Sequence, residues 1–479
     1  MNTKSLKTNA LLNSIKQVCV IIFPMITFPY ASRILGAGNY GKVSFGLSII
    51  SYLSLIAALG IANYSIREGA RIRNDIDSLQ KFVSQIFTLN LLSTLVGYLI
   101  LICLLFFWDA LDSYVLLILV QSVTVLFTTL GVDWINSIFE DYLFITIRYI
   151  VCQVVALILM FLFVKTSEDY IIYALVSASS TVLANIWNLF HIKKYNLKLS
   201  LSHIKDLRPH MGPVIVMFGS AIASLIYINS DVTILGVLTT DLRVGYYSVS
   251  VKIYSLIKQL LNAALAVAIP RFSYELSKGN HDKVNQQLDS LQNILILVAG
   301  PAMIGLFSLS REIVLLFAGS GYMESVSSLR LLSVALLFAT LANFYINVIM
   351  IPLKKEKLIL KTTILSALIN IVLNFILIPK WNESGAAIST IVAEMIMVIV
   401  GAISVRKVYK FNVLKSFVAS TISSILVFAI YVFISNNFVS VFWTILFTVF
   451  CSVIAFALVV LLFFHDELFK NKRLGTRIS

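Results

Sequence analysis

Two lysines lie deep inside an apolar segment of the sequence, where a charge usually needs a partner. Lys252 and Lys258 belong to the segment 245–269, which is long enough to form a membrane helix. At about 1.5 Å per residue, Lys252 lies roughly 10 Å and Lys258 roughly 20 Å from the start of that helix. Ionisable groups at such depth face a cavity or a partner. Each lysine is therefore a candidate to bind an anionic substrate group in a cavity, or to form a structural ion pair.

Two arginines are further candidates for binding an anion. Arg148 is expected one to two turns into the segment 143–165, and Arg33 ends the segment 11–33. A planar guanidinium donates two parallel hydrogen bonds to a phosphate group, whereas an ammonium acts as a point charge. Arg33 has an equally good structural interpretation, because a cation near the C-terminus of a helix interacts favourably with the helix dipole.

Three carboxylates also fall inside the apolar segments: Asp133, Asp231 and Glu394. Asp231 and Lys252 are expected on neighbouring helices, each two to three turns from a shared outer loop, and we predict that they pair. Glu394 is a candidate to bind a coupling ion, H+ or Na+, or to pack against Ser or Thr partners. No cofactor, no metal site and no catalytic residue is expected.

The composition requires a membrane to surround the chain. Hydrophobic residues make up 59% of the 479 residues and charged residues 13%, whereas soluble proteins contain about 25% charged residues. The mean hydropathy is +0.92. These values exclude a soluble enzyme and a nucleic-acid-binding protein, so the net charge of +14 indicates basic cytoplasmic loops. The four cysteines lie in apolar runs and predict no disulfide.

We predict an all-α integral membrane protein with fourteen transmembrane helices. Each crossing needs about 20 mainly apolar residues, and polar, Gly or Pro punctuation divides the chain into segments near 11–33, 41–63, 84–108, 114–137, 143–165, 169–190, 213–237, 245–269, 291–309, 329–351, 358–379, 385–405, 414–435 and 441–464. Lys and Arg gather in every second connection except 138–142, which places both termini in the cytoplasm. No signal-peptide cleavage site precedes the first helix, which is expected to remain as an anchor.

A short motif occurs twice along the chain. Ile34–Gly36 followed by Tyr40–Gly41 is repeated as Ile234–Gly236 followed by Gly245–Tyr246. Because both copies join two helices in the same sense, we predict two pseudo-symmetric six-helix lobes around a central cavity. Gly-Tyr pairs that merely mark the membrane boundary are the alternative. The predicted divisions are an N-terminal lobe, a C-terminal lobe, and helices 13 and 14 with a cytoplasmic tail, at 1–200, 201–410 and 411–479.

Two prolines fall inside the first predicted helix. Pro24 and Pro29 each remove a backbone hydrogen bond and bend the helix. A bend beside a cavity is a candidate hinge for alternating access, and a static bend is the alternative.

The motif residues resemble a known family. Arg33–Gly36 with Tyr40–Gly41, and Tyr64 through Arg71, are similar to the N-terminal signature of Wzx-type polysaccharide flippases, in the multidrug/oligosaccharidyl-lipid/polysaccharide exporter superfamily. The similarity continues to about residue 395, through segments 231–236, 316–322 and 385–394. It implies a flippase in the bacterial inner membrane that moves an undecaprenyl-diphosphate-linked oligosaccharide, an O-antigen or capsule/exopolysaccharide repeat unit, by alternating access. Expected partners are this substrate, membrane lipids and the polysaccharide polymerase machinery, with a monomeric chain.

A multidrug exporter and a polysaccharide polymerase or ligase are the alternatives to a flippase. A cation-coupled multidrug exporter of the same superfamily would favour acidic, aromatic cavities and usually twelve helices. A polysaccharide polymerase or ligase would resemble its relatives in having a large external loop, and this sequence lacks one. No nucleotide-binding motif of the GxxxxGK[ST] type occurs, so ATP hydrolysis by this chain is not expected. With the external loop also lacking, we expect no enzymatic activity. The segment 41–63 has no basic residue beyond Lys42, which disfavours the lipid II branch and favours a surface polysaccharide unit as the substrate.

Overall fold

The computed structural model describes residues 6–266, 281–406, 409, 412–438 and 440–475, and the secondary structure in these ranges is helical. The chain forms two compact units, residues 1–245 and 246–479, which we call unit 1 and unit 2. The boundary between them falls inside helix α9 (Asp241–Ala266). The predicted division into lobes at residue 200 stays a prediction. The ends of the chain and the last residues of the predicted segment 245–269 lie outside the described residues.

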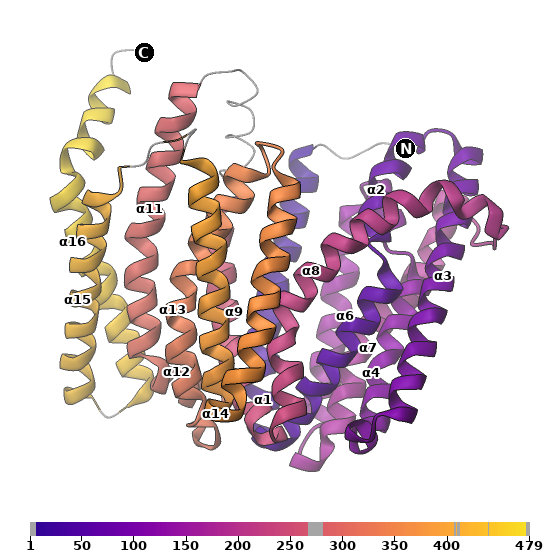
Figure 1. Cartoon of the computed structure of the whole chain (residues 1–479), viewed down its shortest axis with the longest axis horizontal. Helices are drawn as coiled ribbons and strands as arrows, with labels where there is room; N and C mark the ends of the chain where they lie inside the picture. Colours follow the sequence, from indigo (N-terminus) through magenta and orange to yellow (C-terminus); the bar gives the residue numbers. More distant parts are fainter. Residues whose placement is uncertain (1–5, 267–280, 407–408, 410–411, 439, 476–479) are drawn as a thin grey trace. The chain divides into compact units, whose positions relative to one another are not determined.

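Unit 1 is built around a long first helix. Its helices are α1 (Leu6–Ala58), α2 (Ile61–Ile72), α3 (Ile76–Phe107), α4 (Val115–Gly131), α5 (Trp134–Ile138), α6 (Tyr142–Phe163), α7 (Tyr170–His191) and α8 (Arg208–Leu238), with short 3-10 turns η1 (Asp109–Tyr114), η2 (Ser167–Asp169), η3 (Ile192–Tyr195) and η4 (Ile204–Leu207). Helix α7 packs against α4 and α6, and α1 packs against α3, α4, α6 and α8 (Figure 1).

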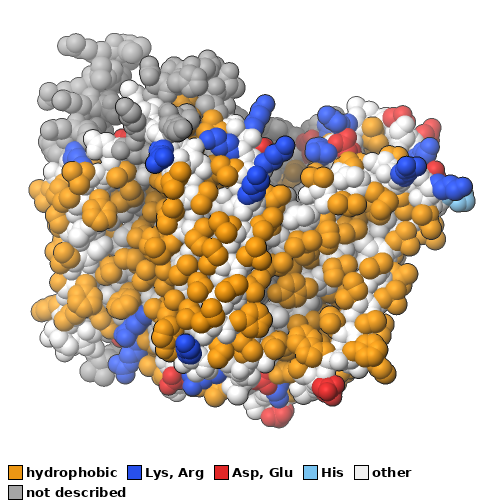
Figure 2. Space-filling view, viewed as in Figure 1, with side chains coloured by type: hydrophobic (Ala, Val, Ile, Leu, Met, Phe, Trp, Pro, Cys, Tyr) orange, Lys and Arg blue, Asp and Glu red, His pale blue; other side chains and the backbone are white. Residues whose placement is uncertain are grey.

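Unit 2 contains the remaining helices. They are the rest of α9, α11 (His281–Ser308), α12 (Ser310–Phe317), α13 (Ser325–Asn343), α14 (Glu356–Val405), α15 (Leu414–Asn437) and α16 (Val441–Gly475), with the 3-10 turn η5 (Ser320–Tyr322) and the π-helical segment η6 (Phe344–Met350). Helix α13 packs against α14 and α11, while α15 packs against α11 and α16. On the face in Figure 2, hydrophobic side chains cover the middle of each unit, and charged side chains gather toward its ends.

Ten helices among the described residues are long and apolar enough to cross a membrane, or eleven if one bent pair within 204–238 is counted. The chain is therefore a multi-pass membrane protein. Two of the ten are far longer than the roughly 20 residues that one crossing needs. Thr8–Ile72 has 65 residues and Glu356–Val405 has 50. Each contains a residue with non-helical backbone, Gly36 and Asn382 respectively, near the junction of two predicted segments. The count of fourteen crossings stays a prediction.

Gly36 divides α1 and Asn382 divides α14 into two helical parts, which we call limbs. The two limbs of each helix pack against one another. In α1, the rings of Phe28 and Tyr40 lie 6.0 Å apart across Gly36, which has a φ of +70°. In α14, the Ser366 hydroxyl donates to the Ala393 carbonyl oxygen at 2.8 Å. Glycine tolerates a left-handed φ without steric cost, which explains why the chain reverses at Gly36.

The repeated Gly-Tyr motif has a packing role within unit 1. A Cβ on Gly41 would lie 1.8 Å from the Asp241 carbonyl oxygen, and a Cβ on Gly245 would lie 1.9 Å from the Ala37 carbonyl oxygen. Glycine is required wherever two backbones approach this closely. The first copy of the motif therefore packs directly on the start of α9. Its glycine has a packing role in addition to any role at the membrane boundary.

Candidate functional site

An arginine–aspartate ion pair lies inside unit 1. Arg148, in the second turn of α6, donates a hydrogen bond from Nη2 to Oδ1 of Asp133. We expected Asp133 within a continuous span 114–137, but α4 ends at Gly131 and Asp133 is the residue before α5. The arginine side chain is only 6% exposed, whereas the aspartate side chain is 42% exposed. The pair therefore has a buried cation and an accessible anion.

The guanidinium of Arg148 uses only part of its hydrogen-bonding capacity. Its Cζ lies 5.3 Å from the centre of the Phe144 ring. Nε and Nη1 are buried and have no hydrogen-bond partner among the described residues. A buried donor without an acceptor is costly, about 1–3 kcal/mol for a neutral group and more for a charged one. These two N–H groups are therefore covered and unsatisfied, in a side chain that lines a cavity.

A polar cavity of about 250 Å³ adjoins this pair. Its walls come from α1, α4, α6 and α7, and the polar residues among them are Lys16, Thr128, Asp133, Arg148, Gln153, Ser180, Thr181 and Asn185. A second cavity of about 160 Å³ lies between α1, α2, α3 and α4 and shares Thr128 and Asp133 with the first. Asp133 thus lines both cavities.

A hydrogen-bond network links Asp133 to the end of α7. Asn136 donates to Asp133 Oδ1 at 3.1 Å and to Asn188 Oδ1 at 2.5 Å. Its own side-chain oxygen accepts from the Tyr195 hydroxyl at 3.3 Å. The Tyr195 hydroxyl lies 3.1 Å from Asp141. These contacts fix the short α5 between α4 and α6, and thereby hold Asp133 opposite Arg148.

Asp141 is the charged end of this network. Its side chain caps the start of α6 and also contacts Lys194 at 2.8 Å and His191 at 3.1 Å. Burial opposes ionisation of this carboxyl, but the hydrogen bonds from Lys194 and His191 outweigh it and lower its pKa to about 2. The predicted connection 138–142 lacks basic residues, and in the structure Lys194 of η3 places a positive charge beside it.

Unit 2 contains a lysine–glutamate ion pair. Lys258 Nζ in α9 lies 2.8 Å from Glu394 Oε1 in the second limb of α14. The ammonium also lies 5.5 Å from the centre of the Tyr254 ring. The lysine side chain is 28% exposed and the glutamate side chain only 5%. Two residues that the sequence nominated separately thus meet, with the cation as the more accessible partner.

The other predicted site residues have the following places. Lys252 is half-buried in α9 and makes no hydrogen bond or ion pair with the described residues of unit 2. Asp231 is buried in α8 of unit 1, and its predicted pairing with Lys252 stays a prediction.

Arg33 is exposed, three residues before the break at Gly36. Pro24 and Pro29 lie within the first limb of α1, whose non-helical residue is Gly36, and their role as a hinge is untested.

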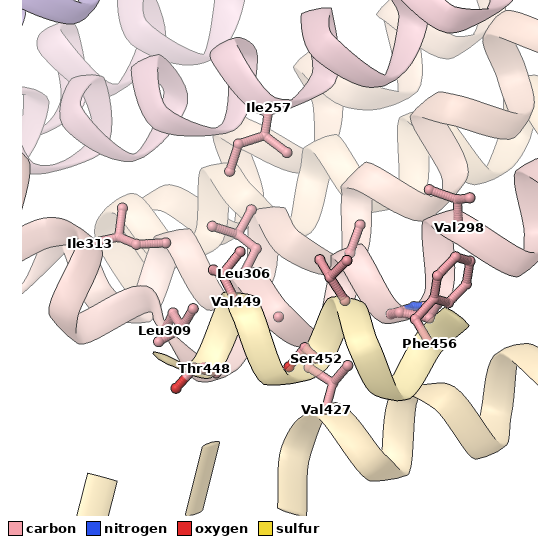
Figure 3. Close-up of a pocket in the computed structure, with 14 residues that line it drawn as sticks. Ile257, Val298, Leu306, Leu309, Ile313, Val427, Thr448, Val449, Ser452 and Phe456 are labelled. Atoms are coloured by element: carbon pink, nitrogen blue, oxygen red, sulfur yellow. The ribbon is translucent and has the colours of Figure 1, made fainter. Parts of the chain in front are cut away.

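An apolar cavity of about 350 Å³ lies in unit 2. Figure 3 shows side chains from several helices converging on it, including Ile257 of α9, Leu306 of α11 and Val449 of α16. Its polar side chains are Thr448 and Ser452 of α16. This space fits a hydrocarbon group and offers almost nothing to a charged one.

Sequence reasoning missed Lys16 as a site residue. It lies near the polar start of the first predicted segment, 11–33, where a lysine is expected to set the topology of the chain. In the structure it lines the same cavity as Arg148. No feature of the sequence brings residue 16 to residue 148. Only the packing of α1 against α6 does so.

Comparison with known proteins places this architecture in a family. A family model described as "Polysaccharide biosynthesis protein" matches residues 6–274, more than half of the chain. The chain belongs to this family. Membership in the polysaccharide biosynthesis protein family confirms the resemblance that the motifs around Gly36 and Gly236 predicted.

Individual members and solved structures agree with this assignment. The chain is 26% identical over 359 residues to a candidate O-antigen transporter of Escherichia coli (strain K12), covering 72% of this chain and 84% of the relative. The structure of the lipid II flippase MurJ in an inward closed conformation matches 96% of this chain and 100% of its own, with a TM-score of 0.77 and 18% identity. An inward-facing multidrug resistance MATE family transporter of the MOP superfamily matches 80% and 94%, with a TM-score of 0.64 and 14% identity. The two structural likenesses show a shared fold.

Proposed function

We propose that this protein is a flippase, not an enzyme. It moves an undecaprenyl-diphosphate-linked oligosaccharide, an O-antigen or capsule/exopolysaccharide repeat unit, across the bacterial inner membrane by alternating access. The observation that carries the proposal is the Lys258–Glu394 pair. A nearly buried carboxylate holds a partly exposed ammonium inside a membrane helix, and such a cation suits a diphosphate. The family and its candidate O-antigen transporter support the same substrate class.

The apolar cavity in unit 2 and the polar cavity beside Arg148 suit the lipid part and the polar part of such a substrate. A lipid-linked sugar needs apolar surroundings for its chain and hydrogen-bonding groups for its hydroxyls. The cavity in unit 2 is almost entirely apolar, whereas the cavity beside Arg148 contains amide and hydroxyl groups. The presence of both kinds of cavity favours a substrate with a lipid part and a polar part.

The remaining assignments complete the proposal. Lys252, Arg33 and Arg148 are further candidate contacts for the anionic group, and Asp231 and Glu394 serve charge pairing or ion coupling. Pro24 and Pro29 are the candidate hinge. Fourteen helices in two six-helix lobes plus two C-terminal helices would leave both termini in the cytoplasm. H+ or Na+ is the candidate coupling ion, the chain acts as a monomer, and the polymerase machinery is the candidate protein partner.

Complementation tests the function. The gene is expressed in a bacterial strain that lacks its own O-antigen or capsule flippase, and the lipid-linked repeat units on each side of the inner membrane are measured. Restored surface polysaccharide and a reduced cytoplasmic pool of lipid-linked units are the expected result. Lipid-linked units that still accumulate inside, despite normal amounts of the protein in the membrane, would overturn the proposal.

Charge removal at Lys258 separates a flippase from an exporter of cationic drugs. Lys258→Ala alone is ambiguous, because it leaves the buried Glu394 without its cation. The double variant Lys258→Gln with Glu394→Gln removes both charges and keeps hydrogen-bonding groups in place. It should abolish complementation, whereas Lys380→Gln, an exposed lysine of α14, should not. A double variant that still exports lipid-linked units would remove Lys258 from the mechanism, and drug efflux that survives it would favour the multidrug exporter.

A further inference from the structure

The cavity beside Arg148 contains more positive charge than its own walls neutralise. Lys16 and Arg148 contribute two cations to it, and Asp133 contributes one carboxylate. Asp133 is bonded to Arg148. Lys16 makes no hydrogen bond or ion pair with the residues described in unit 1. The cavity therefore lacks one negative charge.

Arg148 also has hydrogen-bond donors that no residue uses. Nη2 is bonded to Asp133, and one face of the guanidinium lies over the Phe144 ring. Nε and Nη1 remain buried without an acceptor among the described residues. Arginine has five N–H donors and keeps its charge in proteins, and buried donors are almost always bonded. An anionic acceptor in the cavity would offset the charge, and a small rotation of the guanidinium would bring these covered donors to it.

The size and the other walls define the class of ligand. Pockets for drug-sized molecules measure about 300–1,000 Å³, and this one measures about 250 Å³. Gln153, Thr181 and the second amide N–H of Asn185 add further groups that can donate hydrogen bonds, whereas the Ser180 hydroxyl already donates to the Ser177 carbonyl oxygen. A small oxyanion fits this space and these donors.

We propose that this cavity of unit 1 is a binding site for a phosphate-type oxyanion. Arg148 donates to it through Nε and Nη1, and Lys16 supplies the second positive charge. The oxyanion is either free phosphate or pyrophosphate, or the phosphate group of a polyprenyl lipid. The proposal rests on the flippase function only in the second case, because the first requires no lipid substrate.

Direct binding to the purified full-length protein tests the site. Inorganic pyrophosphate, inorganic phosphate and a short-chain polyprenyl diphosphate are titrated separately by calorimetry, at constant ionic strength in KCl. At least one of them should bind saturably with a stoichiometry of one. Lys16→Gln should weaken binding about 3- to 10-fold and Arg148→Gln at least 10-fold. Lys16→Gln leaves the Arg148–Asp133 pair intact, so it remains informative if Arg148→Gln fails to fold.

A control variant and the choice of ligands give each possible result one interpretation. Lys193→Gln removes an exposed cation of unit 1 that lies over the Phe190 ring and outside the cavity, and its binding should equal that of the natural protein. Binding of the lipid alone assigns the site to a lipid phosphate, and binding of the inorganic ions assigns it to free oxyanions. Failure of all three to bind, or equal weakening by Lys16→Gln and Lys193→Gln, would overturn the proposal. Neither result bears on complementation, so the flippase function is tested independently.

Discussion

The two units each contain a buried ion pair, but the more buried partner is the cation in unit 1 and the anion in unit 2. In unit 1 the cation is buried, with Arg148 6% exposed, and its anion Asp133 is 42% exposed. In unit 2 the anion is buried, with Glu394 5% exposed, and its cation Lys258 is 28% exposed. Unit 2 therefore presents positive charge, and unit 1 presents a carboxylate in front of an arginine with unused donors.

The difference has an energetic consequence. An arginine keeps its proton in a protein, so a buried guanidinium that loses its partner stays charged. A glutamate in the same position takes up a proton and becomes neutral. Losing the exposed partner should therefore be much more harmful in unit 1 than in unit 2. This order can be tested without knowing the substrate.

The largest effect is expected from Asp133→Ala. It leaves the guanidinium of Arg148 buried and unpaired, which should lower the free energy of unfolding by about 3–5 kcal/mol. Denaturant unfolding of the purified protein in mixed micelles measures this change. The double variant Asp133→Leu with Arg148→Met replaces the pair by apolar groups and should recover most of the loss. A loss smaller than that of Lys258→Ala would contradict the comparison.

Lys258→Ala should have an intermediate effect. The expected loss is about 1–3 kcal/mol, that of a buried polar group without its partner, because a buried carboxyl, unlike a guanidinium, need not stay charged. The same unfolding measurement applies, and the series is completed with Glu394→Gln and the double variant. Because the two side chains are in contact, the losses should not add. Additive losses would mean that the 2.8 Å contact contributes nothing to stability.

Exchanging the cation type sharpens the comparison further. Arg148→Lys keeps the charge but removes the planar group that lies over Phe144 and bonds Asp133, so a loss of about 1 kcal/mol is expected. Lys258→Arg introduces a larger cation at a partly exposed position and should cost less. The ratio of the two losses is read from melting temperatures under identical conditions. An equal response would show that only charge matters at both sites.

The class of fold could be predicted from the sequence because it depends on composition and segment length, which are averages over many residues. An apolar content of 59% and repeated long apolar segments require a multi-pass membrane protein, whatever the packing. The motif around Gly36 and Gly41 also led to the correct family. The close contact of Gly41 with the backbone of Asp241 is the physical reason that glycine occurs there.

Partners could not be predicted because they depend on how helices rotate and pack. Lys258 and Glu394 were both nominated, yet they are 136 residues apart and no periodicity links them. Arg148 and Asp133 were also nominated separately, and their contact depends on the short α5 that ends the preceding helix early. Lys16 was indistinguishable from the lysines that set topology. A charge at depth can be read from a sequence, but its neighbour requires the structure.

The smallest effect is expected at the end of the network in unit 1, where Asp141 contacts Lys194 and His191. Asp141→Asn keeps a side chain that can cap α6 and removes the negative charge, so a loss of at most about 1 kcal/mol is expected at neutral pH. Because the folded protein lowers the pKa of this carboxyl from 3.8 to about 2, its stabilising contribution is complete above about pH 5 and is largely lost as the pH falls to about 2. Melting temperatures of the natural protein and the variant should therefore converge over that range. A constant difference down to pH 2 would mean that capping geometry, not the charge of Asp141, stabilises this end of unit 1, and that the ionic contrast between the two units is confined to their buried pairs.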